Sequence, residues 1–258
     1  MEIRRSARPV KTNTSVGEGN RARRVKEILA AANYGDKHFD SVLDAGCGYG
    51  DITLGLSNRY KITGVDPYNK CIEDANSTRK SLELPCNFIQ ASAEKLCFKN
   101  DVFDLVISYN VLEHVDHQKE MIKEFSRVLN PGGVLFLCVP NRYWILESHY
   151  RLPFLSWLPR SLADQAVRLA GKNDRYDAYP PSWWQLNRLL SDYFYVTDMS
   201  CFVLKNISKL YEGPEYHNRF KYYGALVLSN MPAQLLRIFG IMFTEAFIVV
   251  CRVKKVTI

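Results

Sequence analysis

The chain has 258 residues, of which 47% are hydrophobic and 24% are charged. This is enough apolar material for one α/β domain with additions, and it excludes more than two small domains. The formal net charge of +7 suits an anionic substrate, a nucleic acid or an anionic membrane surface, and it does not choose among them.

The seven cysteines are scattered along the chain, with no Cys-x-x-Cys pair. This spacing argues against a zinc cluster or a disulfide framework and favours a reducing compartment. Basic residues are dense between positions 4 and 26, and we interpret them as a solvated tail leading into a helix near residues 20–34. No apolar segment follows the first basic residues, so no secretory signal is expected. We expect a cytoplasmic protein, with peripheral attachment to a membrane as the alternative.

Residues 35–140 alternate between strand-like and helix-like patterns. Strands are expected near residues 41–45, 61–65, 86–90, 103–108 and 133–139, and helices near residues 51–59, 69–82 and 117–129. The Asn-Pro-Gly-Gly sequence at residues 130–133 should end the last of these helices. The short links between elements predict a parallel sheet with helices on both faces.

The alternation stops after Pro140. The segment that follows is long, aromatic and proline-containing, and we interpret residues 141–181 as an inserted lid. Beyond it we expect a helix capped by Ser182 and reaching about residue 192, a strand at 195–205, a second insertion at 206–244 and a buried apolar strand at 246–253.

The most informative motif lies at residues 42–50, where an apolar strand runs into a glycine-rich turn and a helix. Glycines at alternate positions allow a tight turn and close approach of a ligand, and the helix start offers amide N–H groups to an anionic group such as a carboxylate. A dinucleotide-binding turn needs a glycine at position 51, which is aspartate here. The Asp-x-Gly-x-Gly-x-Gly pattern instead resembles the first motif of class I S-adenosylmethionine-dependent methyltransferases. The alternative is an ordinary strand–helix turn. The resemblance assigns cofactor contacts to Asp44, Gly46, Cys47, Gly48 and Gly50.

Two further segments would complete the nucleoside part of this site. Asp66 ends the second expected strand, next to Pro67 and 22 residues after Asp44, where a doubly wound nucleotide site places an acid on the ribose hydroxyls. The alternative is an aspartate favoured by a helix N-terminus. The segment after the third strand resembles the family's adenine-edge segment, with Ser92, Ala93 and Glu94 beside the base; a helix cap by Ser92 is the alternative.

Residues 103–115 closely resemble the Phe-Asp-x-Val … Leu-Glu-His segment of the branch that includes the ubiquinone-pathway O-methyltransferases. Because ligands bind at the carboxyl ends of such strands, Asn110 and Val111 should face the methionine part of the cofactor. In some of these relatives a Glu-x-x-Glu-His set binds a divalent metal; here its first position is Asn110, so we predict no metal site. His114 is a candidate general base, with capping of the loop by Glu113 and His114 as the alternative. His149 is a second candidate base, with an exposed structural role as its alternative.

Two aromatic and apolar stretches bear on the methyl acceptor. Residues 152–160 are interpreted as a lid over the substrate or as a surface that rests on lipid. Four aromatic residues could line an acceptor pocket or pack in the core: Tyr176, Tyr179, Trp183 and Trp184. Residues 224–243 are interrupted by polar residues, so we expect a packed or interfacial helix rather than a membrane span.

The resemblance implies a single methyltransferase domain over residues 1–258. Its expected fold is a doubly wound, Rossmann-like, seven-stranded and mostly parallel α/β sheet with an antiparallel last strand. The expected reaction is O-methylation of a small-molecule, sugar or glycolipid, or quinone-like acceptor by S-adenosylmethionine. The Asn-Pro-Pro-Tyr sequence typical of N-methylating enzymes is absent after the fourth strand, and a nucleic-acid acceptor is disfavoured. The alternatives are a nicotinamide-dependent reductase and a non-catalytic S-adenosylmethionine-binding subunit. The oligomeric state is not predicted.

Overall fold

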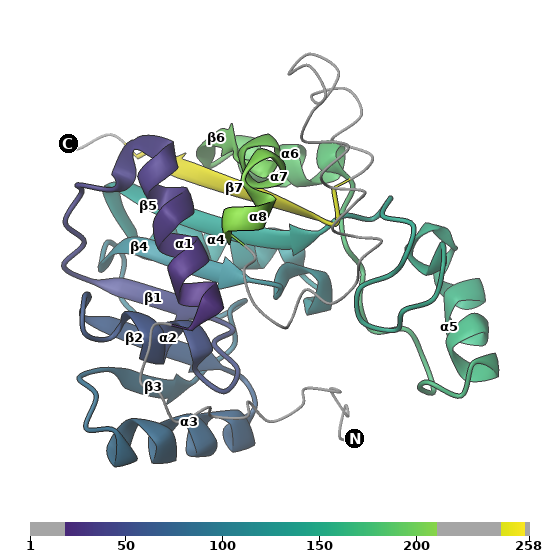
Figure 1. Ribbon diagram of the computed structural model, residues 1–258, viewed down its shortest axis with the longest axis horizontal. Helices are drawn as coiled ribbons and strands as arrows, with labels where there is room; N and C mark the ends of the chain where they lie inside the picture. The colour runs from purple at the N-terminus through teal and green to yellow at the C-terminus, as the bar shows by residue number, and fades with distance from the viewer. Residues whose placement is uncertain (1–18, 211–243, 256–258) are drawn as a thin grey trace.

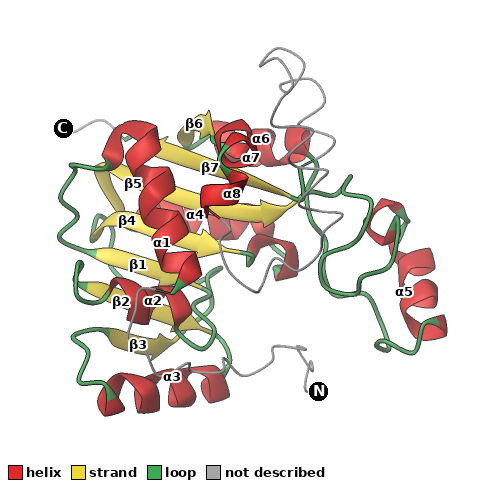
Figure 2. Ribbon diagram, in the orientation of Figure 1, coloured by secondary structure: helices red, strands yellow, loops and turns green. Residues whose placement is uncertain are grey.

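The computed structural model describes residues 19–210 and 244–255, which form a seven-stranded sheet covered by helices (Figures 1 and 2). The strand order is β3-β2-β1-β4-β5-β7-β6. Five strands pair in parallel: β1 (Val42–Ala45), β2 (Ile62–Asp66), β3 (Asn87–Gln90), β4 (Phe103–Tyr109) and β5 (Leu129–Pro140). Strand β7 (Ala246–Val253) lies antiparallel between β5 and β6 (Phe194–Asp198). The predicted fold class is confirmed.

The helical segments described are α1 (Asn20–Leu29), the π-helical η1 (Ala30–Tyr34), α2 (Asp51–Leu56), α3 (Asn69–Ser81), the 3-10 turn η2 (Leu112–His114), α4 (Gln118–Val128), the 3-10 turn η3 (Leu155–Trp157), α5 (Arg160–Leu169), α6 (Trp183–Ser191), α7 (Ser200–Lys205) and α8 (Ile207–Leu210). The helices predicted in the parallel half are present. The predicted Ser182 cap is confirmed, because its hydroxyl accepts the N–H of Gln185 and the Gln185 side chain accepts the N–H of Ser182.

Two hydrophobic cores lie on opposite faces of the sheet, because successive side chains of each strand point to opposite faces. Val42 of β1 and Leu105 of β4 belong to the core that includes apolar residues of α1, α2, α3 and α7. Leu43 and Val106, their neighbours in sequence, belong to the core under α4 and α6. Strand β1 has β2 on one side and β4 on the other. The chain therefore reverses its winding at β1, and ligands of open α/β sheets bind outside the carboxyl ends of the strands at such a point.

Three details differ from the sequence-based expectations. The strand expected at 195–205 is wrong after Asp198: that side chain accepts the N–H of Ser200 and starts α7, while the Ser200 hydroxyl accepts the N–H of Ile248 from β7. Strand β5 begins at Leu129, before the Pro-Gly-Gly sequence, and an irregularity in its pairing with β4 absorbs those residues. Helix α5 was not expected within the lid.

Residues 141–181, called the insertion below, extend beyond the carboxyl ends of the parallel strands, with α5 farthest from the sheet (Figure 1). The insertion has a small core of its own, made of Leu155, Ala163, Val167, Tyr176 and Ala178. No helix in the described part of the chain is long and apolar enough to cross a membrane. The basic residues before position 19 and the helix expected at 224–243 lie outside the described residues.

Candidate functional site

The glycine turn after β1 requires glycine at the residues that form it. Gly46, Gly48 and Gly50 have φ angles of 78°, 54° and 91°, in the left-handed region that other residues rarely adopt. A Cβ atom at Gly46 would lie 2.3 Å from a methyl carbon of Val111, so no side chain fits there. The turn is therefore in direct contact with the first residues after β4, as their predicted shared role in cofactor binding requires.

Asp66, predicted to bind ribose, is completely buried at the end of β2. Its carboxylate accepts the N–H of Gly48 at 3.0 Å and the N–H of Tyr68, the residue before α3, at 3.0 Å. Asp66 thus fixes the glycine turn against the start of α3. Asp66 therefore lies at the predicted site and also stabilises the start of a helix, which was its alternative role. Ribose binding itself stays a prediction. Pro67 follows, and its carbonyl accepts the side-chain N–H of Gln90 at 3.0 Å.

Asp44, the acid of the first motif, is 2% exposed and accepts the hydroxyl of Thr53 at 2.7 Å. Burial raises its pKa to about 7; the hydrogen bonds from Thr53 lower the pKa but do not offset burial, and the neighbouring charges of Asp51 and Asp66 raise it. Within the described residues, no Lys, Arg or His forms an ion pair with Asp44 or Asp66. The turn is thus lined by buried acids that have no cationic ion-pair partner in the described part of the chain. Cys47 lies between them, and its burial and these acids keep its thiol protonated by raising its pKa.

The pKa of Asp44 gives a measurable pH dependence. Because its folded pKa of about 7 lies above the unfolded value of 3.8, its contribution to stability is complete below pH 3.8 and is lost as the pH rises through 7. We expect the free energy of unfolding of the wild type, relative to Asp44→Asn, to fall by about 2–3 kcal/mol between pH 5 and pH 8. Urea unfolding of both proteins at the two pH values tests this. An equal pH dependence in both would show that Asp44 is ionised across the range.

The segment predicted to meet the adenine is a tight turn. The Ser92 hydroxyl accepts the N–H of Glu94 and donates to its carboxylate, each at 3.2 Å, and Ala93 between them is buried. The other carboxylate oxygen of Glu94 accepts the N–H of His117 at 3.1 Å. The Ser92 side chain therefore stabilises a turn and does not cap a helix, which was its alternative role, and the adenine contact stays a prediction.

The exit from β4 is distorted at Asn110, whose φ of 57° is left-handed. Its N–H donates to the carbonyl of Cys138 on β5 at 2.9 Å, and its side-chain oxygen accepts the Cys138 thiol at 3.5 Å. The distortion directs Val111 onto Gly46 and starts η2. The predicted cofactor residues Asn110 and Val111 therefore lie at the carboxyl end of the central strands.

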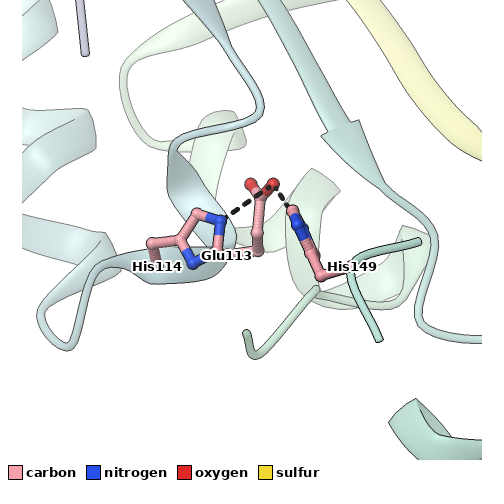
Figure 3. A group of neighbouring side chains, drawn as sticks. All are labelled: Glu113, His114 and His149. Atoms are coloured by element: carbon pink, nitrogen blue, oxygen red, sulfur yellow. Dashed lines mark ion pairs between the residues drawn. The ribbon is translucent and has the colours of Figure 1, made fainter. Parts of the chain in front are cut away.

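Immediately after this exit, Glu113 and His114 of η2 meet His149 of the insertion (Figure 3). One Glu113 oxygen, Oε1, lies 3.4 Å from His149 Nε2 and 3.8 Å from His114 Nε2. The two imidazole rings are 4.7 Å apart in an edge-to-face arrangement. We call these three residues the Glu–His–His cluster. The structure thus brings together the two candidate bases, which are far apart in sequence, around a carboxylate.

Glu113 is completely buried, and neither of its carboxylate oxygens has a hydrogen bond of acceptable geometry. Its closest cationic neighbours are the two histidines. Burial lowers the pKa of His149, but the carboxylates of Glu113 and Glu147 outweigh that effect, so the pKa lies above its usual value. His149 is only 27% exposed at its side chain, so it does not have the exposed role that was its alternative.

The insertion positions the cluster through several contacts that the sequence did not reveal. The Glu147 carboxylate accepts the N–H groups of His149 and Tyr150, which fixes the backbone that carries the imidazole. The carbonyl of Asp177 lies 3.2 Å from His114 Nδ1, and the N–H of Tyr179 donates to the carbonyl of Glu113. In the sequence, only the position of Glu147, two residues before His149, indicates a role in positioning the imidazole.

The aromatic residues proposed for an acceptor pocket do not gather around one point. Tyr176 is buried in the core of the insertion and Tyr179 packs against it. Trp183 packs on Phe247 of β7, with ring centres 5.5 Å apart, and Trp184 is 64% exposed. Core packing therefore accounts for Trp183 and Tyr176.

Comparison with known proteins shows which families this chain resembles. Residues 43–137 match the family model described as a methyltransferase domain. A ubiquinone biosynthesis O-methyltransferase from Rickettsia typhi is 29% identical over 140 residues, which cover 51% of this chain and 55% of the relative. A protein of the same name from Rhizobium etli is 30% identical over 46% of this chain and 50% of the relative. The chain therefore spans about half the length of the curated relatives it matches.

Residues 43–137 are a methyltransferase domain, and the relatives support the class I S-adenosylmethionine-dependent type. This match confirms the predicted resemblance and favours it over the nicotinamide-dependent reductase. A solved SAM-dependent methyltransferase from Methanosarcina mazei, 21% identical, aligns with a TM-score of 0.56 over 86% of this chain and 96% of its own, and it supports the fold alone. The methyltransferase region at 43–137 includes the glycine turn, Glu113 and His114, whereas His149 lies outside it.

Proposed function

We propose that this chain transfers the methyl group of S-adenosylmethionine to a hydroxyl oxygen of a small-molecule acceptor. The observation that carries the proposal is the contact between Val111 and Gly46. It joins the glycine turn, which the family resemblance assigns to the cofactor, to the strand exit that leads into the Glu–His–His cluster. We place the acceptor where these two parts meet, between the carboxyl ends of β1 and β4 and the insertion.

The buried acids favour S-adenosylmethionine as the ligand of the turn. This cofactor carries a sulfonium and an ammonium group, and a cationic ligand would offset the cost of burying Asp44 and Asp66 without a protein cation. We assign its binding to the residues predicted from sequence: Asp44, Gly46, Cys47, Gly48, Gly50, Asp66, Pro67, Ser92, Ala93, Glu94, Asn110 and Val111.

The proposed reaction is a single in-line displacement. A lone pair of the acceptor oxygen attacks the methyl carbon, the carbon–sulfur bond breaks, and its electron pair stays on sulfur, which becomes a neutral thioether. The hydroxyl proton is lost at the Glu–His–His cluster. Because the sulfonium methyl is already activated, the protein contributes chiefly by positioning the reactants and excluding water.

Two observations support a quinone-like or otherwise amphiphilic acceptor over a polar one. The curated relatives are named as ubiquinone biosynthesis O-methyltransferases. The insertion also presents the large apolar side chains of Ile145, Phe154, Trp157 and Leu162 to solvent, next to the exposed Arg160. Such a surface suits peripheral contact with an anionic membrane, where an amphiphilic acceptor would be held. Co-sedimentation with anionic and neutral lipid vesicles tests this contact, and equal recovery with both would contradict it.

The reaction is tested by incubating the protein with methyl-labelled S-adenosylmethionine and a host extract or a set of catechols, phenols and glycolipids, followed by mass spectrometry. We expect a labelled methyl ether and a stoichiometric amount of S-adenosylhomocysteine. His149→Ala should lower turnover by roughly 10²–10⁴-fold at saturating cofactor, the usual effect of losing a proton-transfer group, and leave cofactor affinity unchanged. His117→Ala, an exposed histidine at the start of α4, is the matched control. Cofactor binding without turnover on any acceptor would instead favour a non-catalytic binding subunit.

A further inference from the structure

The Glu–His–His cluster has the spacing of a metal site. The ligand atoms that its three residues offer all lie within 4.8 Å of one another. A tetrahedral cation with bonds of about 2.1 Å holds its ligand atoms about 3.4 Å apart. The 3.4 Å and 3.8 Å separations of Glu113 Oε1 from the two Nε2 atoms are close to such edges, and the two histidine ligand atoms lie within 4.8 Å of each other.

The hydrogen bonding of His114 gives its outer nitrogen the right protonation for a ligand. His114 Nδ1 faces the carbonyl of Asp177 at 3.2 Å, and a carbonyl can only accept. Nδ1 therefore carries the proton, and in the neutral ring Nε2 directs a lone pair towards Glu113. A backbone carbonyl that fixes the tautomer in this way is the usual outer partner of a metal-bound histidine.

The charge balance of the cluster also calls for a cation. Glu113 is fully buried, and both of its oxygens lack a hydrogen bond. An isolated buried carboxylate costs several kcal/mol, and no Lys or Arg among the described residues forms an ion pair with it. His149 Nε2, which faces the same oxygen, has no hydrogen-bond partner either. The Glu113 oxygens and His149 Nε2 thus face one another without a hydrogen bond of suitable geometry, and His114 Nε2 lies beside them.

We propose that Glu113, His114 and His149 bind one divalent first-row transition-metal cation such as Zn²⁺, Mn²⁺ or Co²⁺. Two imidazoles and one carboxylate favour these ions over Mg²⁺ and Ca²⁺, which prefer oxygen ligands. Three protein ligands leave at least one coordination position for water or an acceptor oxygen. The sequence provided only two ligands at the exit of β4, so we had predicted no metal; the third comes from the insertion, outside the matched methyltransferase region.

The catalytic consequence of the metal rests on the proposed function, but its binding does not. Within that function, a bound cation would lower the pKa of the acceptor hydroxyl, and the proton would pass to solvent water because the three residues would then serve as ligands and not as bases. The chain's own contribution is to hold the ligands. Glu147 fixes the backbone of His149, and the Asp177 carbonyl orients His114. The cation would also tie the insertion to the exit of β4.

The binding test uses the full chain, freed of metal with a chelator and titrated with Zn²⁺, Co²⁺, Mn²⁺ or Mg²⁺. We expect one equivalent of Zn²⁺ or Co²⁺ by elemental analysis after desalting, a visible Co²⁺ spectrum of a four- or five-coordinate site, and at least 100-fold weaker binding of Mg²⁺. His114→Ala and His149→Ala should each weaken Zn²⁺ and Co²⁺ binding at least 100-fold and abolish the spectrum. His117→Ala should change neither measurement.

Glu113→Gln separates a metal ligand from a structural acid. In the metal-free protein this change removes a buried charge whose closest cationic neighbours are the two histidines, so we expect only a small change in Tm, whereas the increase in Tm caused by Zn²⁺ in the wild type should disappear. If this variant does not fold, the affinity of His149→Ala for Zn²⁺ tests the proposed metal site instead. The proposal is overturned if Zn²⁺ and Co²⁺ do not bind stoichiometrically, or if His149→Ala binds them as tightly as the wild type. Metal binding without methyl transfer would overturn the proposed function alone.

Discussion

Gly46→Ala is expected to lower the free energy of unfolding by about 3 kcal/mol and to weaken S-adenosylmethionine binding at least tenfold, from the combined cost of overpacking and a left-handed φ. The added methyl group would lie 2.3 Å from one Val111 methyl carbon and 2.7 Å from the other. Both methyl carbons belong to the Val111 side chain at the exit of β4, so either the glycine turn or that exit must move. Urea unfolding measures the first effect, and titration calorimetry measures the second.

A matched control isolates the contact from the backbone angle. Gly132 has a φ of 75°, close to the 78° of Gly46, but a Cβ atom there would meet nothing within 4 Å. Gly132→Ala should therefore cost only the strain of the left-handed angle, about 1–2 kcal/mol, and leave cofactor binding unchanged. Adding Val111→Ala to Gly46→Ala should recover part of the lost affinity. Equal effects of the two glycine substitutions on binding would show that the Val111 contact does not shape the site.

Asp66→Ala is expected to weaken S-adenosylmethionine binding by roughly 1.5–3 kcal/mol, the scale of hydrogen bonds to a charged group. The carboxylate would be lost both as the predicted ribose partner and as the acceptor of the N–H groups of Gly48 and Tyr68. Asp66→Asn keeps one acceptor oxygen and should retain part of the affinity. Calorimetry with both variants, at a pH where the wild type is stable, gives the comparison.

Asp74→Ala is the control for this prediction. Asp74 lies on α3 near Asp66 in sequence, but it is partly exposed and pairs with Lys70 on the same helix. Its removal should leave the affinity for S-adenosylmethionine unchanged within error, since exposed ion pairs contribute little. If Asp66→Ala binds as tightly as Asp74→Ala, Asp66 braces the turn without contacting the cofactor.

The parallel half of the fold could be predicted from sequence because local patterns there agree with the tertiary structure. Each strand is a short apolar run, and each is followed by a turn or a polar helix start that marks its end. The glycines at 46, 48 and 50 also predicted the turn correctly, because the turn needs left-handed backbone angles that glycine adopts readily. Ser182 began a helix for the same local reason, through its reciprocal bonds with Gln185.

The predictions from sequence were wrong or incomplete where contacts with distant residues determine the local structure. Seven of the eleven residues at 195–205 are apolar, and the switch from strand to helix after Asp198 depends on its bond to Ser200 and on the contact of Ser200 with β7. The Glu–His–His cluster is similar. Neither the spacing of Glu113 and His114 nor the sequence around His149 shows that they meet, because the path of the insertion brings His149 to η2.

The separate core of the insertion has a consequence for how acceptor choice can change. Leu155, Val167 and Tyr176 pack with one another rather than with either face of the sheet, so substitutions among them leave the two main cores intact. Under the proposed function, a chimera that exchanges residues 141–181 for those of another family member would keep its cofactor half and acquire a new acceptor preference. The exchanged stretch would have to preserve the histidine opposite Glu113 and the carboxylate of Glu147 that fixes its backbone.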